Sequence, residues 1–362
     1  MSVIARFAPA LLCVCLLACQ PDAADSDTAS AARTGDPLPS AAASGQSLST
    51  QQSILVSLIA RHHFAKPSPA ALRERLDRGE SVHSLLASLD PYSRLLDAEQ
   101  AGLRRRRAEL QRVGAGLDIL FDGPQAYAVA VPGTPFADAV GSGTATALQQ
   151  LDKQPVSGTD ISSFRPLVSH RAGETLSVGL GDGRTLSLPV VRYPNAALYF
   201  EQDDDGAMIR IRQFRSGQTR ELAAYLRQAM RGSALVLDLR FSPGGDLFAM
   251  TDWLSLFLPP GLEIGRVLSA QGERRLHTLP GQIAGLPPLT VLIGGFTASS
   301  AEIFARVLKQ HRPGTRLVGG PTRGKCLVQR NFALPGGAEL QLSTGEFVIG
   351  NQSCQGRPLW PD

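Results

Sequence analysis

The C-terminal half of the sequence predicts an α/β fold, and two features support that prediction. Apolar runs at 234–241 and Leu289–Ile293 are nearly continuous instead of alternating, which is typical of strands buried on both faces. Stretches with helical spacing, at 217–231 and 300–310, separate these runs. In a sheet of this kind, functional groups collect at the ends of the strands.

Two other regions precede this half, and their patterns differ. Residues 50–111 carry helical spacing broken at prolines and predict an N-terminal helical region. Residues 112–193 alternate over short stretches between glycine and proline turns, which predicts a small β-rich domain. The sequence thus predicts three folded parts, of which residues 194–362 form the α/β core.

The N-terminus is typical of an exported bacterial protein. Residues 1–19 have one arginine and then a short apolar stretch, as in a secretory signal peptide. Leu16–Cys19 resembles a lipobox, in which Cys19 is lipidated and becomes the mature first residue; plain signal cleavage is the alternative. Residues 20–49 are polar and predict a disordered tether. With Gln20 after the cysteine, we expect a lipid-anchored outer-membrane lipoprotein on the periplasmic side of the cell envelope.

Composition argues against several other classes of protein. A net charge of +4 over 362 residues does not indicate nucleic-acid binding. The basic run Arg104–Arg107 lies in a helical stretch and is interpreted as a solvated helix face. His62 and His63 have no acidic or histidine partner at metal-ligand spacing, so we expect no metal, and no cofactor.

The cysteines divide into two groups. Of the five in the chain, Cys13 and Cys15 would leave with the signal peptide and Cys19 would carry the lipid. The mature body keeps Cys326 and Cys354. In an oxidising compartment these two form one disulfide or remain two buried thiols, and the sequence leaves both open.

Two adjacent serines lie where an apolar strand meets a helix, within Thr297–Ile303. They can cap the helix, or one of them can be a nucleophile facing the helix-end amides. A hydroxyl needs a base, and the nearest histidine, His311, lies at the far end of the helix. A lysine can serve when burial lowers its pKa. Only four of the 36 basic residues are lysine, and one of them, Lys325, lies between turn glycines and an apolar run.

The segment 299–329, SSAEIFARVLKQHRPGTRLVGGPTRGKCLVQ, resembles the C-terminal processing, or tail-specific, peptidases. This family consists of Ser-Lys serine peptidases with a PDZ domain. The resemblance implies that Ser299 is the nucleophile, Lys325 the general base and Gln329 the residue that supports the base. Ser300 is the competing nucleophile, because the link from the helix to the lysine is one residue longer than in the usual pattern.

Further segments extend the resemblance to most of residues 53–362. They are LDLRFSPGG at 237–245, SLLASLDPYSRLL at 84–96 and the final Pro-Asp. The resemblance implies a crotonase/ClpP-like peptidase core with an N-terminal helical segment and an inserted PDZ-like domain at 112–193. It also implies an oxyanion site made by the amide of Ser300 with one from Gly244 or Gly245.

The implied function is that of a serine endopeptidase acting on envelope proteins with accessible, apolar C-terminal tails. Loop amides near Gly114 and Gly116 would bind the tail's carboxylate after strand addition. One alternative is a catalytically decayed, PDZ-containing lipoprotein that acts as a binding scaffold; another is a thioester hydrolase of the same fold. The chain departs from the pattern at Cys326, which replaces a glycine, and lacks the usual Gly-Asp pair of the PDZ domain. The sequence does not identify an adaptor protein.

Overall fold

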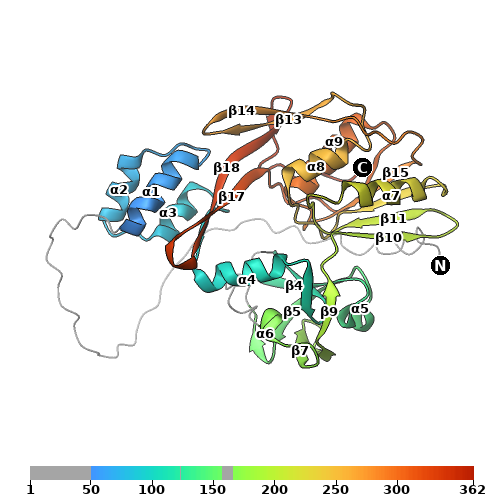
Figure 1. Cartoon of the computed structure of the whole chain (residues 1–362), viewed down its shortest axis with the longest axis horizontal. Coiled ribbons are helices and arrows are strands. Elements are labelled where there is room, and N and C mark those ends of the chain that lie inside the picture. Colours follow the sequence, from blue (N-terminus) through green and yellow to red (C-terminus); the bar gives the residue numbers. More distant parts are fainter. Residues whose placement is uncertain (1–49, 123, 157–165) are drawn as a thin grey trace, which may run out of the picture.

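The computed structural model describes residues 50–122, 124–156 and 166–362. The predicted signal peptide, the predicted lipidation of Cys19 and the predicted tether lie outside the described residues. Figure 1 shows a small helical body, a β-rich body and a larger α/β body, with a long hairpin running between the first and the last. Within the described ranges, no helix has the length and apolar character needed to cross a bilayer.

The helical body packs against a strand from the far end of the chain. Leu55, Leu86 and neighbouring side chains share one apolar cluster with Leu340 and Leu342. This body is therefore joined to the C-terminal part by buried apolar surface as well as by the chain. Its elements, with those that follow it, are α1 (Thr50–His62), α2 (Pro69–Asp77), α3 (Val82–Leu89), β1 (Arg94–Leu96) and α4 (Ala98–Ala108).

The β-rich body has an apolar core of its own. Its elements are β2 (Gln111–Gly114), β3 (Leu117–Asp122), β4 (Gln125–Ala130), α5 (Pro135–Val140), β5 (Ala145–Leu151), β6 (Gln154–Pro155), α6 (Pro166–Ser169), β7 (Thr175–Leu180), β8 (Thr185–Pro189) and β9 (Val191–Pro194). The main sheet has the order β3-β4-β5-β7-β8, with β6 beside β5, and β2 pairs with β9 where the chain enters and leaves. Strand β3 is an edge strand, because within the described residues it pairs only with β4.

The α/β body contains a five-stranded sheet of order β10-β11-β12-β15-β16. Strand β10 is antiparallel to β11, and the remaining pairs are parallel. The predicted α/β class is confirmed. The elements are β10 (Leu198–Gln202), β11 (Ala207–Ile211), α7 (Thr219–Ala229), β12 (Leu235–Asp238), α8 (Leu247–Leu254), β15 (Leu289–Ile293), α9 (Ser300–His311) and β16 (Arg316–Gly319).

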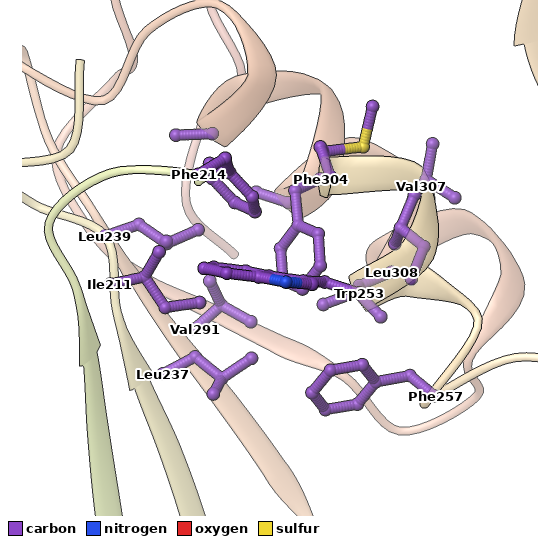
Figure 2. Packing of buried hydrophobic residues seen from close by; sticks show 14 of the residues in the cluster. Ile211, Phe214, Leu237, Leu239, Trp253, Phe257, Val291, Phe304, Val307 and Leu308 are labelled. Carbon is purple, nitrogen blue, oxygen red and sulfur yellow. The ribbon is translucent and has the colours of Figure 1, made fainter. Parts of the chain in front are cut away.

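Aromatic packing fixes the helices on this sheet (Figure 2). The ring of Phe214 lies 4.9 Å from that of Trp253 on α8 and 5.1 Å from that of Phe304 on α9, centroid to centroid. All three rings are buried and contact the apolar side chains of β11, β12 and β15. Such aromatic burial is among the largest contributions to a core, and here it holds α8 and α9 against the sheet.

A second sheet is built around the long strand β18 (Glu339–Ile349), which pairs with four other strands along its length. Figure 1 shows β18 running from the α/β body to the helical body. Its partners in the sheet and the turn before it are β1, β13 (Glu263–Ser269), β17 (Leu327–Ala333), β19 (Gln352–Ser353) and η4 (Pro335–Gly337), with β14 (Gly272–His277) beyond β13. Strand β17, which follows Lys325, thus lies in the same sheet as β1 from the N-terminal part of the chain and β19 near the C-terminus.

Candidate active site

Ser299 lies in a strained turn between β15 and α9. Its backbone has φ +56° and ψ −129°, and it is one of only four non-glycine residues with positive φ in the described chain. Such a conformation costs about 1–3 kcal/mol and persists only where the surroundings impose it. Although Ser299 is the N-cap residue of α9, its side chain makes no capping hydrogen bond. The capping explanation for this serine is therefore wrong, and its hydroxyl is left for another role.

The strained conformation is held from three sides. The Ser299 amide donates to the carbonyl of Lys325 at 3.0 Å, and its carbonyl accepts from the first turn of α9. The amide of the preceding residue, Ala298, donates to Ser242 at 3.1 Å. The first of these bonds places the backbone of Ser299 directly beside that of Lys325.

Ser300 has a different environment. It is 2% exposed, and its hydroxyl donates to the carbonyl of Gly245 at 3.0 Å. The Ser300 hydroxyl is therefore used to hold the glycine turn. Of the two candidate nucleophiles, the geometry favours Ser299.

The glycine turn lies against both serines. A Cβ on Gly244 would come within 2.9 Å of the Cβ of Ser299 and of the Ser300 nitrogen, and a Cβ on Gly245 within 2.2 Å of the Phe214 carbonyl. Gly244 and Gly245 also have φ of +99° and +143°, which a side chain would strain. The amides of Ser300, Gly244 and Gly245 donate to no residue that the structure describes. They are available to an oxygen of a ligand.

The environment of Lys325 favours its neutral form. Burial lowers the pKa of the Lys325 amine to about 8, and the positive charge of Arg94 adds to this effect, while the charge of Asp90 opposes it. The amine donates to the amide oxygen of Gln329 at 2.7 Å. Among the described residues no carboxylate forms an ion pair with Lys325, and no hydrogen bond joins its amine to the hydroxyl of Ser299.

Tyr92, which sequence reasoning did not single out, lies beside this pair. Its ring centroid is 4.7 Å from the Lys325 amine, and its carbonyl accepts from the Gln329 side-chain nitrogen at 2.9 Å. Since the nitrogen is committed to Tyr92, the oxygen of the same amide faces the lysine. Tyr92 thus orients Gln329 and covers one side of the amine.

A buried carboxylate holds the turn that carries Tyr92. Asp90 accepts from the amides of Tyr92 and Ser93 and from the hydroxyl of Ser343, at 2.7–2.9 Å. It also lies 2.9 Å from Nε2 of His63, whose Nδ1 accepts from a backbone amide, so the proton is on Nε2. Burial raises the pKa of Asp90, but these hydrogen bonds outweigh it and lower the value to about 2. The helical body therefore contributes to the position of the lysine.

Glu302 holds the loop before Lys325 against α9. It is 0% exposed and accepts from the Thr322 hydroxyl at 2.7 Å and from the amides of Gly324 and Lys325 at 2.9 and 3.0 Å. Burial raises the pKa of this carboxyl despite its donors. An acidic residue on the buried face of a helix needs partners, but the sequence does not show which residues supply them.

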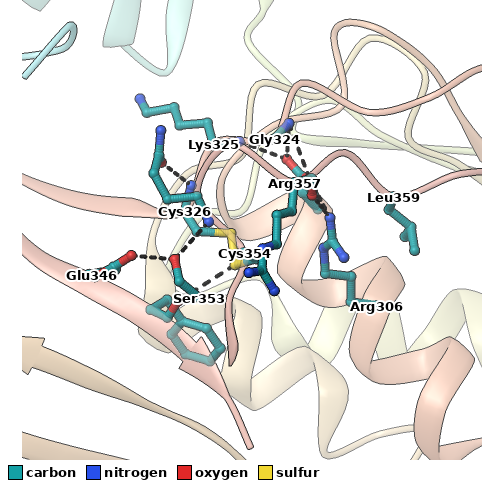
Figure 3. The surroundings of a disulfide bond; sticks show 12 residues. Arg306, Gly324, Lys325, Cys326, Glu346, Ser353, Cys354, Arg357 and Leu359 are labelled. Carbon is teal, nitrogen blue, oxygen red and sulfur yellow. Dashed lines mark hydrogen bonds and ion pairs between the residues drawn. A yellow bond between two sulfur atoms is a disulfide. The ribbon is translucent and has the colours of Figure 1, made fainter. Parts of the chain in front are cut away.

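The structure joins Cys326 to Cys354 by a disulfide, with 5.5 Å between the Cα atoms. Figure 3 shows the bond beside the lysine loop, with the Lys325 side chain leaving the loop on the opposite side. The Cys326 amide donates to the side chain of Gln355 at 2.9 Å. The segment after β19 is thereby fixed to the residue next to Lys325.

Gly114 and Gly116 lie in the β-rich body, before the edge strand β3, and not beside the serines. Gly116 has φ +87°, and a Cβ there would overlap the Thr134 side chain at 1.9 Å. Close by, Arg112 donates to the Leu117 carbonyl at 3.1 Å and to the Asp118 carboxylate at 2.7 Å. Arg112, which sequence reasoning did not single out, therefore lies beside the loop at Gly114 and Gly116 that is expected to bind the carboxylate of the tail.

No group of three or more histidine, cysteine or acidic side chains in the described part of the chain is arranged to hold a metal ion.

Comparison with known proteins gives a consistent result. Residues 205–362 match the sequence profile of peptidase family S41. The carboxyl-terminal-processing protease of Synechocystis sp. is 31% identical over 291 residues, which are 76% of this chain and 68% of the relative. The carboxy-terminal-processing protease of Bartonella bacilliformis is 26% identical, over 78% of this chain and 68% of the relative.

Solved structures show the same fold. The photosystem II D1 C-terminal processing protease superposes with a TM-score of 0.66 at 23% identity, covering 87% of this chain and 93% of that one. An S41 protease from Bacteroides fragilis gives 0.55 at 15% identity, covering 85% and 88%. The resemblance in the sequence is confirmed: the chain belongs to peptidase family S41, the serine-type carboxyl-terminal-processing proteases.

Proposed function

We propose that this protein cleaves proteins near their C-terminal tails with Ser299 as nucleophile, Lys325 as general base and Gln329 as the residue that orients the base. The observation that carries this proposal is the uncapped hydroxyl of Ser299 in a strained turn whose amide is bonded to Lys325. A lysine with a pKa of about 8 is partly neutral at physiological pH and can accept a proton.

In the first step the Ser299 oxygen attacks the scissile carbonyl carbon, and its proton passes to the neutral Lys325 amine. The Lys325 side chain rotates from Gln329 towards Ser299 for this step; catalytic hydrogen bonds often shorten only when substrate binds. Collapse of the intermediate breaks the carbon–nitrogen bond, and Lys325 returns the proton to the leaving amine. Lys325 then takes a proton from water, whose oxygen attacks the acyl carbon. Collapse of this second intermediate breaks the bond to the Ser299 oxygen, and Lys325 returns the proton to that oxygen.

The negative oxygen of each tetrahedral intermediate would be bound by the amide of Ser300 with one from Gly244 or Gly245. Support comes from the lack of an acceptor for these amides among the residues that the structure describes, and from the absence of side chains at the two glycines. Removing one such donor typically costs about 10²–10³ in kcat.

The substrate tail would bind to the β-rich body, which we propose to be a PDZ-like domain at 112–193 inserted before a crotonase/ClpP-like core at 194–362. Within the described residues β3 pairs only with β4, so its other edge can accept an added strand once the side chains of Arg112 and Arg323 leave the carbonyls of Leu117 and Phe121. The turn at Gly114 and Gly116 lies at the start of β3. An edge of this kind binds an extended peptide through main-chain hydrogen bonds.

The N-terminal sequence supports a location in the bacterial cell envelope. We propose that the signal at 1–19 is removed, that lipid on Cys19 anchors the protein on the periplasmic side of the outer membrane, and that 20–49 is the tether. A diacyl or triacyl anchor binds a membrane stably, unlike a single acyl chain.

The direct test is to incubate the protein with an unstructured protein substrate beside the Ser299→Ala and Lys325→Ala variants. We expect cleavage by the parent protein and none by either variant. Equal degradation by all three would remove the peptidase proposal. Substrate binding without cleavage by the parent protein would instead indicate the scaffold.

A further inference from the structure

A cavity of about 460 Å³ lies between the β-rich body and the candidate active site. Its lining includes Phe241 and Pro243, which lie just before the glycine turn, and Arg94. Residues 118–121 of β3 also line it. Four consecutive strand residues present both side-chain faces and the edge between them, so the edge of β3 opposite β4 faces the cavity. At this edge the side chains of Arg112 and Arg323 donate to the carbonyls of Leu117 and Phe121, so an added strand must displace them.

The direction of a tail added to β3 follows from the chain. A tail whose C-terminus lies at the Gly114–Gly116 turn must run antiparallel to β3, so its upstream residues lie at the Phe121 end. This end is the one beside the catalytic loops: Arg323, two residues before Lys325, donates to the Phe121 carbonyl at 2.8 Å. The cavity therefore covers the part of the tail between the scissile bond and the C-terminus, about four residues or 13 Å of extended chain.

The wall of the cavity is strongly basic. Four arginines and one aspartate supply its charged side chains: Arg94, Arg104, Arg112, Arg212 and Asp118. Arg112 and Arg212 both bind Asp118, and Arg104 binds Glu339. Arg94 alone among these arginines has no carboxylate partner within the described residues. Its Nε donates to the side chain of Gln341 at 2.6 Å, which leaves the terminal nitrogens for a ligand.

We infer that this cavity receives the residues that follow the scissile bond, and that Arg94 selects substrates with an acidic side chain among them. The inference rests on the proposed function and adds a charged position to tails that the family resemblance describes as apolar. Arg94 is exposed to the cavity and has no carboxylate partner among the described residues, so its planar guanidinium can bind a carboxylate of the substrate. This carboxylate accepts two parallel hydrogen bonds.

The test uses pairs of peptides that differ only by Glu or Gln at one of the first three positions after the cleaved bond. Each pair is made with a free and with an amidated C-terminus, and kcat/KM is measured with the full chain. We expect the parent enzyme to prefer Glu at one position by about 10- to 100-fold, as for a hydrogen-bonded ion pair. The preference should be the same in the amidated pair.

The Arg94→Gln variant should reduce this ratio to about one. Because the charge of Arg94 also lowers the pKa of Lys325, the variant changes the rate on both peptides, and only the ratio reports selection. Arg94→Lys should keep part of the preference. Arg105→Gln is the matched control: Arg105 also binds Glu339 but does not line the cavity, so the ratio should stay at the parent value.

Each outcome has a distinct meaning. A Glu/Gln ratio near one in the parent enzyme, or a ratio unchanged by Arg94→Gln, overturns the inference while Ser299-dependent cleavage keeps the proposed function. If the Arg94-dependent preference disappears in the amidated pair, Arg94 binds the C-terminal carboxylate of the tail. That result overturns the inference that it binds an acidic side chain. If no peptide is cleaved in a Ser299-dependent way, the proposed function fails and the inference fails with it.

Discussion

The two halves of the candidate active site are held in place by different forces. Ser299 is positioned by the backbone at the end of a parallel strand and by an aromatic core that fixes α8 and α9. Lys325 is positioned by hydrogen bonds to Gln329 and Glu302 and by a disulfide at the next residue. The position of Ser299 therefore depends on packing, which is insensitive to pH and redox state. The position of Lys325 depends on polar and covalent contacts, which are sensitive to both.

The largest expected effect comes from a substitution next to Ser299. In Gly244→Ala the new methyl group would lie 2.9 Å from the Cβ of Ser299 and would strain a residue at φ +99°. We expect kcat to fall about 10²–10³-fold, as for loss of an oxyanion donor, with no shift in the pH profile. Gly295→Ala is the control, because a Cβ at Gly295 meets no atom within 4 Å. A shift of the pH profile in Gly244→Ala would contradict the separation of the halves.

A smaller effect, and one that depends on pH, is expected from Gln329→Glu. The amine is active when neutral, so kcat/KM of the parent should rise with pH through about 8. A carboxylate 2.7 Å from the amine favours the charged form and raises the lysine pKa, which moves this rise to higher pH. Activity at pH 7 should fall about 10- to 100-fold and recover in part at pH 9–10.

The control for this charge is Gln329→Leu, which removes the orienting hydrogen bond without adding a charge. It should lower activity without moving the rise to higher pH. Equal pH profiles for the Glu and Leu variants would show that the identity of residue 329 does not tune the base.

Reduction of the disulfide should weaken the base half alone. The bond closes a loop between cysteines separated by 28 residues, so its loss should lower the free energy of unfolding by about 3 kcal/mol. Because Cys326 follows Lys325 directly, we expect kcat to fall by up to about tenfold as the loop loosens. The measurement is activity and thermal unfolding with and without dithiothreitol. The double variant Cys326→Ser with Cys354→Ser should be indifferent to the reductant; equal sensitivity would place the effect elsewhere.

The smallest expected effect is a gain in stability. Ser299→Gly relieves the positive φ at the strained turn, and the free energy of unfolding should rise by about 1 kcal/mol while activity is lost. Ser299→Ala removes the same hydroxyl but keeps the strain, so it is the reference in thermal or urea unfolding. A glycine variant no more stable than the alanine variant would show that the turn stores no strain.

Several residues of the site could be predicted because their signals are local. The resemblance to the tail-specific peptidases implies Ser299, Lys325 and Gln329, because its pattern is a serine three residues before a helical glutamate and a glutamine four residues after a lysine. The functions of Tyr92, Glu302 and Arg94 could not be predicted in this way. Tyr92 meets Gln329 across 237 residues, and Glu302 meets Gly324 across 22, so neither contact leaves a periodic signal.

The sequence alone predicted the α/β class and the order of the three folded parts, because hydrophobic period is a property of neighbouring residues. The hydroxyl–lysine–glutamine set was implied by the resemblance of one segment to a family. The sequence left open which of two serines is the nucleophile and whether the two cysteines are bonded. Only the tertiary structure decided that the Ser300 hydroxyl is bound to Gly245, that Ser299 is strained and uncapped, and that Cys326 meets Cys354. Backbone strain, burial and the pairing of distant side chains arise when separate segments pack, so they are not encoded at any one position.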